Sequence, residues 1–196
     1  MVTSTELIYF SLAWVVSVYL FNSALAREFK TVKLKPLLLY VSTVAMIGTF
    51  GEVFWDGLYE KVFGMPLWQY YILPLHNGHT SYFAAILWGF YGFHLYLLYD
   101  TINKRFKWAV KYLPLIFSLE ALIIEALVSI TFKLVFHKWL YYYLPNGLWH
   151  VSAFQNFPLY FMAGYVILGT IKRFRNNAWF FILMNCALMS VLIFLV

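Results

Sequence analysis

Three carboxylates lie four residues apart in one apolar stretch of the sequence. Glu52, Asp56 and Glu60 occur in the run Glu-Val-Phe-Trp-Asp-Gly-Leu-Tyr-Glu, whose other side chains are mostly apolar. A four-residue spacing places successive side chains on one face of a helix. A charged side chain in hydrocarbon costs roughly 2.5–3.5 kcal/mol on insertion scales. The stripe therefore predicts a polar cavity inside a bundle of helices, where we expect the function to reside.

A second apolar stretch, residues 108–136, carries Glu120 and Glu125. Counting the rise of a helix from the ends of the two stretches puts Glu52 and Glu125 at similar depth, so they can face one another. Glu120 and Glu125 are about 140° apart around a helix and cannot both point squarely into one cavity. We predict Glu52 and Glu125 as an acid–base pair, Asp56 as a further catalytic group, and Glu120 as a supporting polar group.

Proton transfer is the chemistry that such a pair favours. Two carboxylates in a low-dielectric site can hold a proton with different affinities, so that one donates while the other accepts. Aromatic faces can stabilise a cation, as a protonated alkene would require. The predicted substrate is a hydrophobic, lipid-like molecule, and the sequence indicates no particular cofactor. The further substrate contacts that we predict are Trp55, Tyr59, His79, Trp88 and His150.

Three other functions are compatible with the same residues. The His-Asn-Gly-His run at 76–79, joined by Asp56, Glu52 or His150, offers the nitrogen and oxygen ligands of a zinc or iron enzyme. Carboxylates inside membranes also form proton relays in transporters. A structural subunit of a larger membrane complex is the fourth interpretation.

Purely structural roles are also open for several charged residues. Asp56 can pair with Lys133 near the outer boundary of the membrane, and Glu60 with its neighbour Lys61. His94, on an apolar stretch, is typical of a hydrogen-bonded histidine in a core.

The elements that must position these groups are membrane helices. The chain has 196 residues, is 63% hydrophobic and only 11% charged, whereas a soluble domain is about 25% charged. We predict an all-α, polytopic integral membrane bundle that forms one domain over residues 1–196. Only helices satisfy their own backbone in lipid, and a β-barrel is a poor match. The six predicted spans are residues 7–26, 36–59, 82–99, 108–136, 157–171 and 179–196.

The first span resembles a signal peptide, but no positive residue precedes it and its apolar run is longer than a signal core, so we expect a retained helix. The only cysteine, Cys186, excludes an internal disulfide.

The cationic residues occur at alternate connections. Eleven of fourteen lie within residues 27–35, 104–111 and 172–175. The positive-inside rule places these connections in the cytoplasm, and both termini outside the cytoplasm or in a lumen. The net charge of +6 therefore sets topology and indicates no nucleic-acid partner. We expect the lipid bilayer and a hydrophobic small molecule as partners, and the oligomeric state is open.

The two internal connections on the other side, residues 61–81 and 137–156, are rich in Trp and Tyr. Such residues favour the membrane interface, so we predict that residues 66–79 and 137–156 cover the cavity from outside. The segment from Pro66 to Pro74 is typical of a short interfacial helix or a re-entrant turn.

A partial resemblance to the emopamil-binding (EXPERA) membrane family, which includes sterol isomerases, covers about a third of the chain. The similar positions are Glu52, Tyr59-Glu60, Gly64, Leu87-Trp88-Gly89 and Pro158-Leu159-Tyr160-Phe161. The chain departs from the family pattern at Gly48, where a histidine is expected, and at residues 81–83, which lack a carboxylate. It also has more predicted spans than the usual four or five. The resemblance carries over Glu52 alone, and implies a bundle that holds a sterol-like or isoprenoid ligand and moves protons across it.

Overall fold

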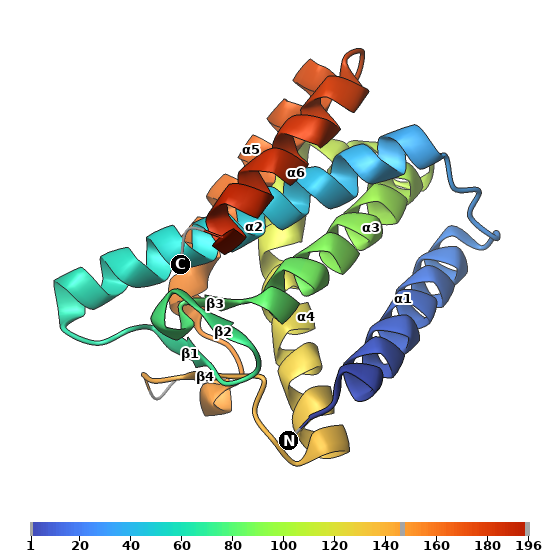
Figure 1. Cartoon of the computed structure of the whole chain (residues 1–196). Coiled ribbons are helices and arrows are strands. Elements are labelled where there is room, and N and C mark those ends of the chain that lie inside the picture. The colour runs from blue at the N-terminus through green and yellow to red at the C-terminus, as the bar shows by residue number, and fades with distance from the viewer. Residues whose placement is uncertain (1, 146–147, 195–196) are drawn as a thin grey trace.

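The computed structural model describes residues 2–145 and 148–194, which form a mainly helical molecule (Figure 1). The α-helices of this part of the chain are α1 (Ser4–Ala26), α2 (Leu34–Phe63), α3 (Tyr82–Arg105), α4 (Leu113–Phe136), α5 (Phe157–Phe174) and α6 (Ala178–Phe194). The helices α1, α2 and α3, and α4 with the 3-10 turns that precede it, are long and apolar enough to cross a membrane; α6 is apolar but shorter. The prediction of an all-α fold is confirmed, and four helical segments could cross a membrane by their length and composition.

The helix ends follow local capping signals. Thr3 and Glu6 form a capping box at the start of α1, which satisfies backbone N–H groups that have no partner within the helix. At the end of α2, Gly64 adopts a φ of 76°, a conformation that glycine reaches without a steric penalty. The predicted fourth span divides into 3-10 turns over Lys107–Tyr112 and the helix α4, which has Pro114 in its first turn.

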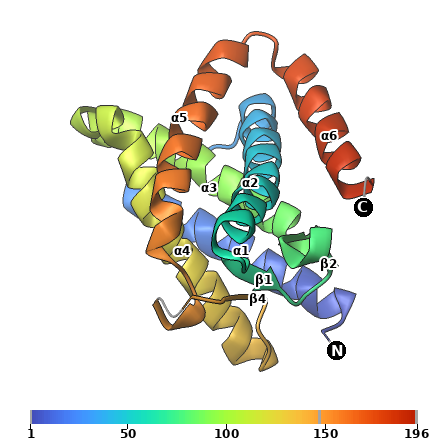
Figure 2. The same ribbon diagram turned by 90° about the vertical axis from the view of Figure 1, so that its left-hand side faces the viewer.

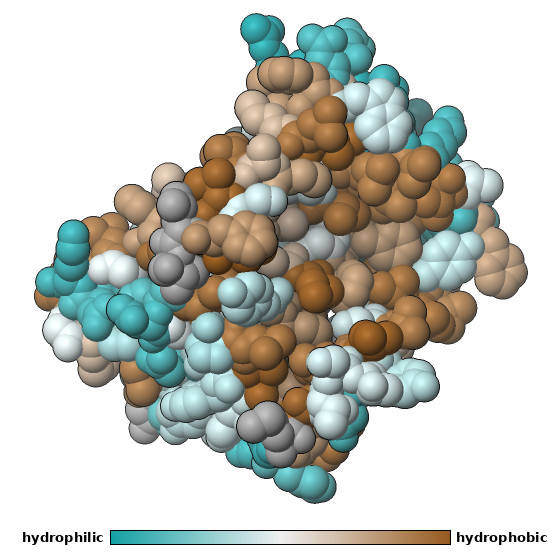
Figure 3. Space-filling model, viewed as in Figure 1, coloured by the Kyte–Doolittle hydropathy of each residue, from teal (hydrophilic) through white to brown (hydrophobic). Residues whose placement is uncertain are grey.

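Helix α2 lies at the centre of the bundle. It packs most extensively on α3 and also contacts α5 and α6, which lie on either side of it in Figure 2. The α2–α3 crossing is close because Gly92 of α3 lies against the backbone of α2, where a Cβ would come within 2.8 Å of Tyr40 O. Asn185 of α6 donates to the hydroxyls of Ser42 and Thr43 at 3.2 Å. Much of the face in Figure 3 is apolar.

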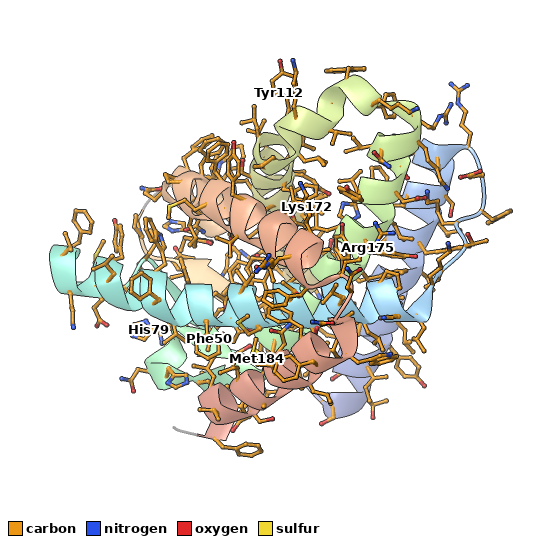
Figure 4. All side chains as sticks on the ribbon, turned by 90° about the horizontal axis from the view of Figure 1, so that it is seen from above. Phe50, His79, Tyr112, Lys172, Arg175 and Met184 are labelled. Carbon is orange, nitrogen blue, oxygen red and sulfur yellow. The ribbon has the colours of Figure 1, made fainter. Side chains whose placement is uncertain are left out.

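The basic connections lie together at one end of the bundle. Lys30 and Lys104 both pair with Asp100, and Arg105 donates to the carbonyl of Leu25 at 3.1 Å. Lys172 and Arg173 lie in the last turn of α5 and Arg175 directly follows it, and the α5–α6 connection lies at the end of the bundle where α2 begins (Figure 2). Figure 4 shows Lys172 and Arg175 near this connection.

The two aromatic connections are joined by short strands at the other end. Strand β1 (Trp68–Tyr70) pairs antiparallel with β4 (Tyr141–Tyr143), so that Trp68 is opposite Tyr143 and Tyr70 is opposite Tyr141. A second pair joins β2 (Pro74–Leu75) to β3 (Thr80–Ser81). A helix within residues 66–74 is therefore a wrong prediction, because tryptophan and tyrosine favour paired strands and the partner strand lies in a distant loop. We call β1 and β4 the ribbon.

Candidate functional site

The ribbon turns four aromatic side chains toward the helices. Along each strand the first and third residues are buried and the middle one is half-buried, as the alternation of strand side chains requires. The buried set is Trp68, Tyr70, Tyr141 and Tyr143. The three tyrosines carry hydroxyl groups into the bundle. Those of Tyr70 and Tyr143 meet the predicted carboxylates, and that of Tyr141 donates to the backbone carbonyl of Glu125 at 2.6 Å.

Glu52 projects from α2 beneath the ribbon and is buried. Its Oε1 accepts from the hydroxyl of Tyr70 and its Oε2 from that of Thr80, both at 2.5 Å. Tyr70 ends β1 and Thr80 begins β3, so one carboxylate joins α2 to both strand pairs. Both donors lie in the connection 61–81, and Tyr70 belongs to the part, residues 66–79, that was predicted to cover the cavity.

Glu125 projects from α4 and has a similar set of partners. Tyr143 of the ribbon and Tyr160 of α5 donate to its Oε1, the latter at 2.9 Å, while Ser152 donates to Oε2 at 2.6 Å. The amide of Asn156 donates to the Tyr143 hydroxyl at 2.5 Å. The second carboxylate therefore ties α4 to the ribbon and to α5.

The two glutamates share an unusual electrostatic setting. Among the described residues neither forms an ion pair with Lys, Arg or His, whereas Asp100 and Glu120 do. Their side-chain donors are neutral hydroxyls. Burial first, and the neighbouring carboxylate second, raise the pKa of the Tyr70 and Tyr143 hydroxyls well above its usual value. These phenols therefore remain proton donors at ordinary pH.

Two apolar clefts meet at this pair. The α1 cleft lies between α1, α3 and α4 and has a volume of about 90 Å³; the α5 cleft lies between α2 and α5 and has about 240 Å³. Both clefts are lined by the same six residues where they meet: Glu52, Tyr70, Trp88, Glu125, Tyr141 and Tyr160. The prediction that Glu52 and Glu125 face a common cavity matches this arrangement, in which polar groups converge within mainly apolar walls.

Trp88 of α3 is held at the junction by a glycine. A Cβ at Gly48 of α2 would lie 2.2 Å from Cδ2 of Trp88, so the indole occupies the space of the missing side chain. The ring also makes edge contacts with Tyr91 and Tyr160, at centroid distances of 5.9 and 6.0 Å. The absence of a side chain at position 48 therefore positions an aromatic wall beside the carboxylates.

Asp56, one turn after Glu52, has a different environment. Its Oδ1 accepts from the backbone N–H groups of Leu67 at 2.5 Å and Trp68 at 3.2 Å, and its Oδ2 lies 2.5 Å from Nδ1 of His79. The other ring nitrogen of His79 is 3.2 Å from Glu60. Figure 4 places His79 beside the C-terminal part of α2. None of Asp56, His79 and Glu60 lines either cleft; together they anchor the start of the ribbon, and we call them the latch.

Two charge pairs that the sequence suggested have other partners in the structure. The partner of Asp56 is His79 and not Lys133, whose ammonium instead lies 3.6 Å from the centre of the Trp139 ring. Glu60 likewise pairs with His79. Both differences arise because the connection 64–81 folds back over α2 and brings His79 to these carboxylates. The spacing of residues along one helix does not reveal this fold of the connection.

The remaining predicted contacts are divided between the clefts and their surroundings. Trp55 lines the α5 cleft, and its buried indole nitrogen has no hydrogen-bond partner within the described residues. Tyr59 packs on Phe63, and the ring of His150 stacks on Tyr142 with centroids 4.2 Å apart. Neither Tyr59 nor His150 lines a cleft.

Glu120 pairs with His94 outside the junction. His94 is buried and lines the α1 cleft, with Nε2 facing the carboxylate of Glu120 and Nδ1 2.8 Å from the amide of Asn22. This places His94 as a hydrogen-bonded histidine within the protein. Glu120 lines neither cleft, so of this pair only His94 brings a polar group to the wall of the α1 cleft.

Sequence reasoning missed the hydroxyl donors, chiefly Tyr70, Thr80, Tyr143 and Ser152, and the position of His94 on the cleft wall. The two connections contain five tyrosines, so only knowledge of the strand register distinguishes the tyrosine donors from their neighbours. For His94 a signal existed, because Glu120 had no expected partner on its own helix.

Within residues 2–145 and 148–194, no three His, Cys, Asp or Glu side chains are grouped so that they could hold a metal ion. His76 bonds instead to the carbonyl of Leu192 in α6 at 2.9 Å, away from His79 and His150. Comparisons of the chain with family models, with curated proteins and with solved structures found no match in any of the three.

Proposed function

We propose that the protein is a membrane-embedded enzyme that transfers protons to and from a hydrophobic, lipid-like substrate, with Glu52 and Glu125 as the acid–base pair. The observation that supports this most is the setting of the two carboxylates. They line a common junction between two apolar clefts, and within the part of the chain that the structure describes each is hydrogen-bonded by hydroxyls and by no cationic side chain. A carboxylate that is not neutralised by a cation is free to exchange its proton with a bound molecule.

The proposed reaction is an isomerisation that leaves the composition of the substrate unchanged. One glutamic acid protonates a carbon of an alkene, and the second, as a carboxylate, removes a proton from a neighbouring carbon so that the double bond moves. The aromatic walls at the junction, chiefly Trp88 and Tyr160, offer ring faces to the transient positive charge. Tyr70 and Tyr143 hold the carboxylates in place through their hydroxyls.

The membrane arrangement that fits this proposal has all six helices crossing the bilayer. The basic connections would then face the cytoplasm, and the ribbon and both termini the other side. The likeness to the emopamil-binding family is part of the same proposal, because it too assigns an acid–base role to Glu52. The exposed apolar residues Phe54 and Met162 at the edge of the α5 cleft would give a substrate entry directly from the lipid.

Incorporation of deuterium into carbon tests the proposal without knowledge of the substrate. Protein in mild detergent is incubated in D₂O with total lipids extracted from the expression host, and the lipids are analysed by mass spectrometry. Wild type is expected to add non-exchangeable deuterium to one lipid class. Glu52→Gln and Glu125→Gln should each reduce the rate at least about 100-fold, as the loss of a general acid or base does.

Glu60→Gln is the matched control, since Glu60 lies outside both clefts, and it should retain the wild-type rate. Incorporation that persists in both cleft variants would overturn the assignment, as would its absence from wild type.

A further inference from the structure

The two clefts extend away from the carboxylates between different helices. The α1 cleft follows α3 from Ala84 to His94, and the α5 cleft follows α2 from Val44 to Trp55. Each distance is about 15 Å at the rise of a helix. Because the clefts share their lining only near Glu52 and Glu125, a molecule that fills both has its middle at the carboxylates and its ends apart.

The volumes also favour an occupant of both clefts. Small-molecule sites in proteins have volumes of about 300–1,000 Å³. Neither the α1 cleft, with about 90 Å³, nor the α5 cleft, with about 240 Å³, reaches this range alone. The two together just reach it, so an occupant of ordinary size would extend into both clefts past the residues that they share, among them Trp88.

The charges on the walls restrict the polar part of the occupant. Among residues 2–145 and 148–194 no Lys or Arg lines either cleft, and the titratable groups there are Glu52, Glu125, His94 and tyrosines. A phosphate or carboxylate head group at the junction would face two acidic side chains with no cation to compensate. Neutral hydrocarbon with an uncharged reacting group fits these walls.

We infer that the substrate is a long, neutral, linear hydrocarbon chain whose reacting group lies between its two ends, with one arm in each cleft. This inference rests on the proposed function, since it names the substrate class of the same site. It distinguishes a flexible chain from a compact fused-ring molecule, which one cleft would have to hold alone. The internal position of the reacting group follows from the position of Glu52 and Glu125 at the junction.

Binding of three alcohols, measured by native mass spectrometry in mild detergent, tests the inference. Oleyl alcohol is a long chain with a mid-chain double bond, decanol is a chain about half as long, and cholesterol is compact. Wild type should bind one oleyl alcohol more tightly than cholesterol. Met162→Trp lies at the edge of the α5 cleft and Val18→Trp lies in the α1 cleft. Each should weaken the affinity for oleyl alcohol about tenfold, while decanol should still bind in the cleft that the substitution leaves free.

Exposed neighbours outside the clefts supply matched controls. Tyr165→Trp on α5 and Val16→Trp on α1, at positions 58% and 55% exposed, should leave the binding of all three alcohols unchanged. Val18→Phe, with a smaller ring, replaces Val18→Trp if the larger side chain prevents folding.

Preference for cholesterol, sensitivity to only one of the two cleft substitutions, or no binding of oleyl alcohol would each overturn the inference. Binding is read without any reaction. A chain that binds as described but gains no deuterium would thus contradict the proposed function and leave this inference standing.

Discussion

Glu52 and Asp56 are one helical turn apart on α2, yet the structure gives them opposite environments. Glu52 lines the junction of two clefts and accepts from the hydroxyls of Tyr70 and Thr80. Asp56 lies outside both clefts and accepts from two backbone N–H groups while it pairs with His79. A buried carboxylate in an apolar helix is therefore not by itself a sign of catalysis. Under the proposed function, the type of its donors, and whether it borders a cavity, would separate a catalytic from a structural role.

We expect the largest difference between the two residues in protein stability, where Asp56→Ala should have a far greater effect than a substitution of Glu52. The substitution leaves the N–H groups of Leu67 and Trp68 and the imidazole of His79 without their buried acceptor. We expect a loss of about 3–5 kcal/mol in the free energy of unfolding, measured by denaturation in mild detergent. Glu52→Gln should change it by less than about 1 kcal/mol, because the hydroxyls of its partners can reorient toward an amide. Equal losses in both variants would remove the distinction.

The packing of Trp88 beside Glu52 can be tested by a substitution of Gly48, against which the indole ring lies. Gly48→Ala places a Cβ 2.2 Å from the Trp88 ring, which must move, at a cost of about 1–3 kcal/mol in the free energy of unfolding. Gly57→Ala is the matched control on the same helix, since no atom lies within 4 Å of its Cβ position. At position 57 the better helix propensity of alanine should raise the free energy of unfolding by about 0.5–1 kcal/mol. Thermal unfolding measures both, and a stable Gly48→Ala would contradict this packing.

The environment of Glu52 also predicts a dependence on alkaline pH. Burial, and then the charge of Glu52, raise the pKa of Tyr70 well above its usual value. The stability that Tyr70 contributes is therefore complete below about pH 10, where the unfolded chain keeps its phenols protonated, and is lost as pH rises further. The expected slope is about 1.4 kcal/mol per pH unit for one tyrosine. Unfolding followed above pH 10 should show a smaller slope in Tyr70→Phe than in the control Tyr71→Phe, and equal slopes would count against the account.

The smallest effect concerns the cation that the sequence suggested as a partner of Asp56. Lys133 lies over the ring of Trp139, and an exposed contact of this kind contributes about 0.5–1 kcal/mol. Lys133→Ala should therefore lower the free energy of unfolding by no more than that amount. A loss as large as that of Asp56→Ala would indicate that the two residues do form a pair.

The helices could be predicted from the sequence because long apolar runs and the capping residues at their ends are local signals. The facing positions of Glu52 and Glu125 followed from the same helical rise. The pairing of β1 with β4 could not be predicted, since Trp68 and Tyr143 are far apart in the sequence and a one-residue slip would turn other side chains inward. For the same reason the hydroxyl donors were missed, and with them the difference between Glu52 and Asp56.

The most direct test of the central claim compares Glu52→Gln with Asp56→Asn in one preparation, by measuring deuterium incorporation per folded molecule. Asparagine keeps an oxygen for the backbone N–H groups, so a folded fraction should remain. The account predicts that folded Asp56→Asn protein incorporates deuterium near the wild-type rate, while fully folded Glu52→Gln protein is inactive. An active Glu52→Gln variant beside an inactive, folded Asp56→Asn variant would contradict it and place the chemistry at the latch.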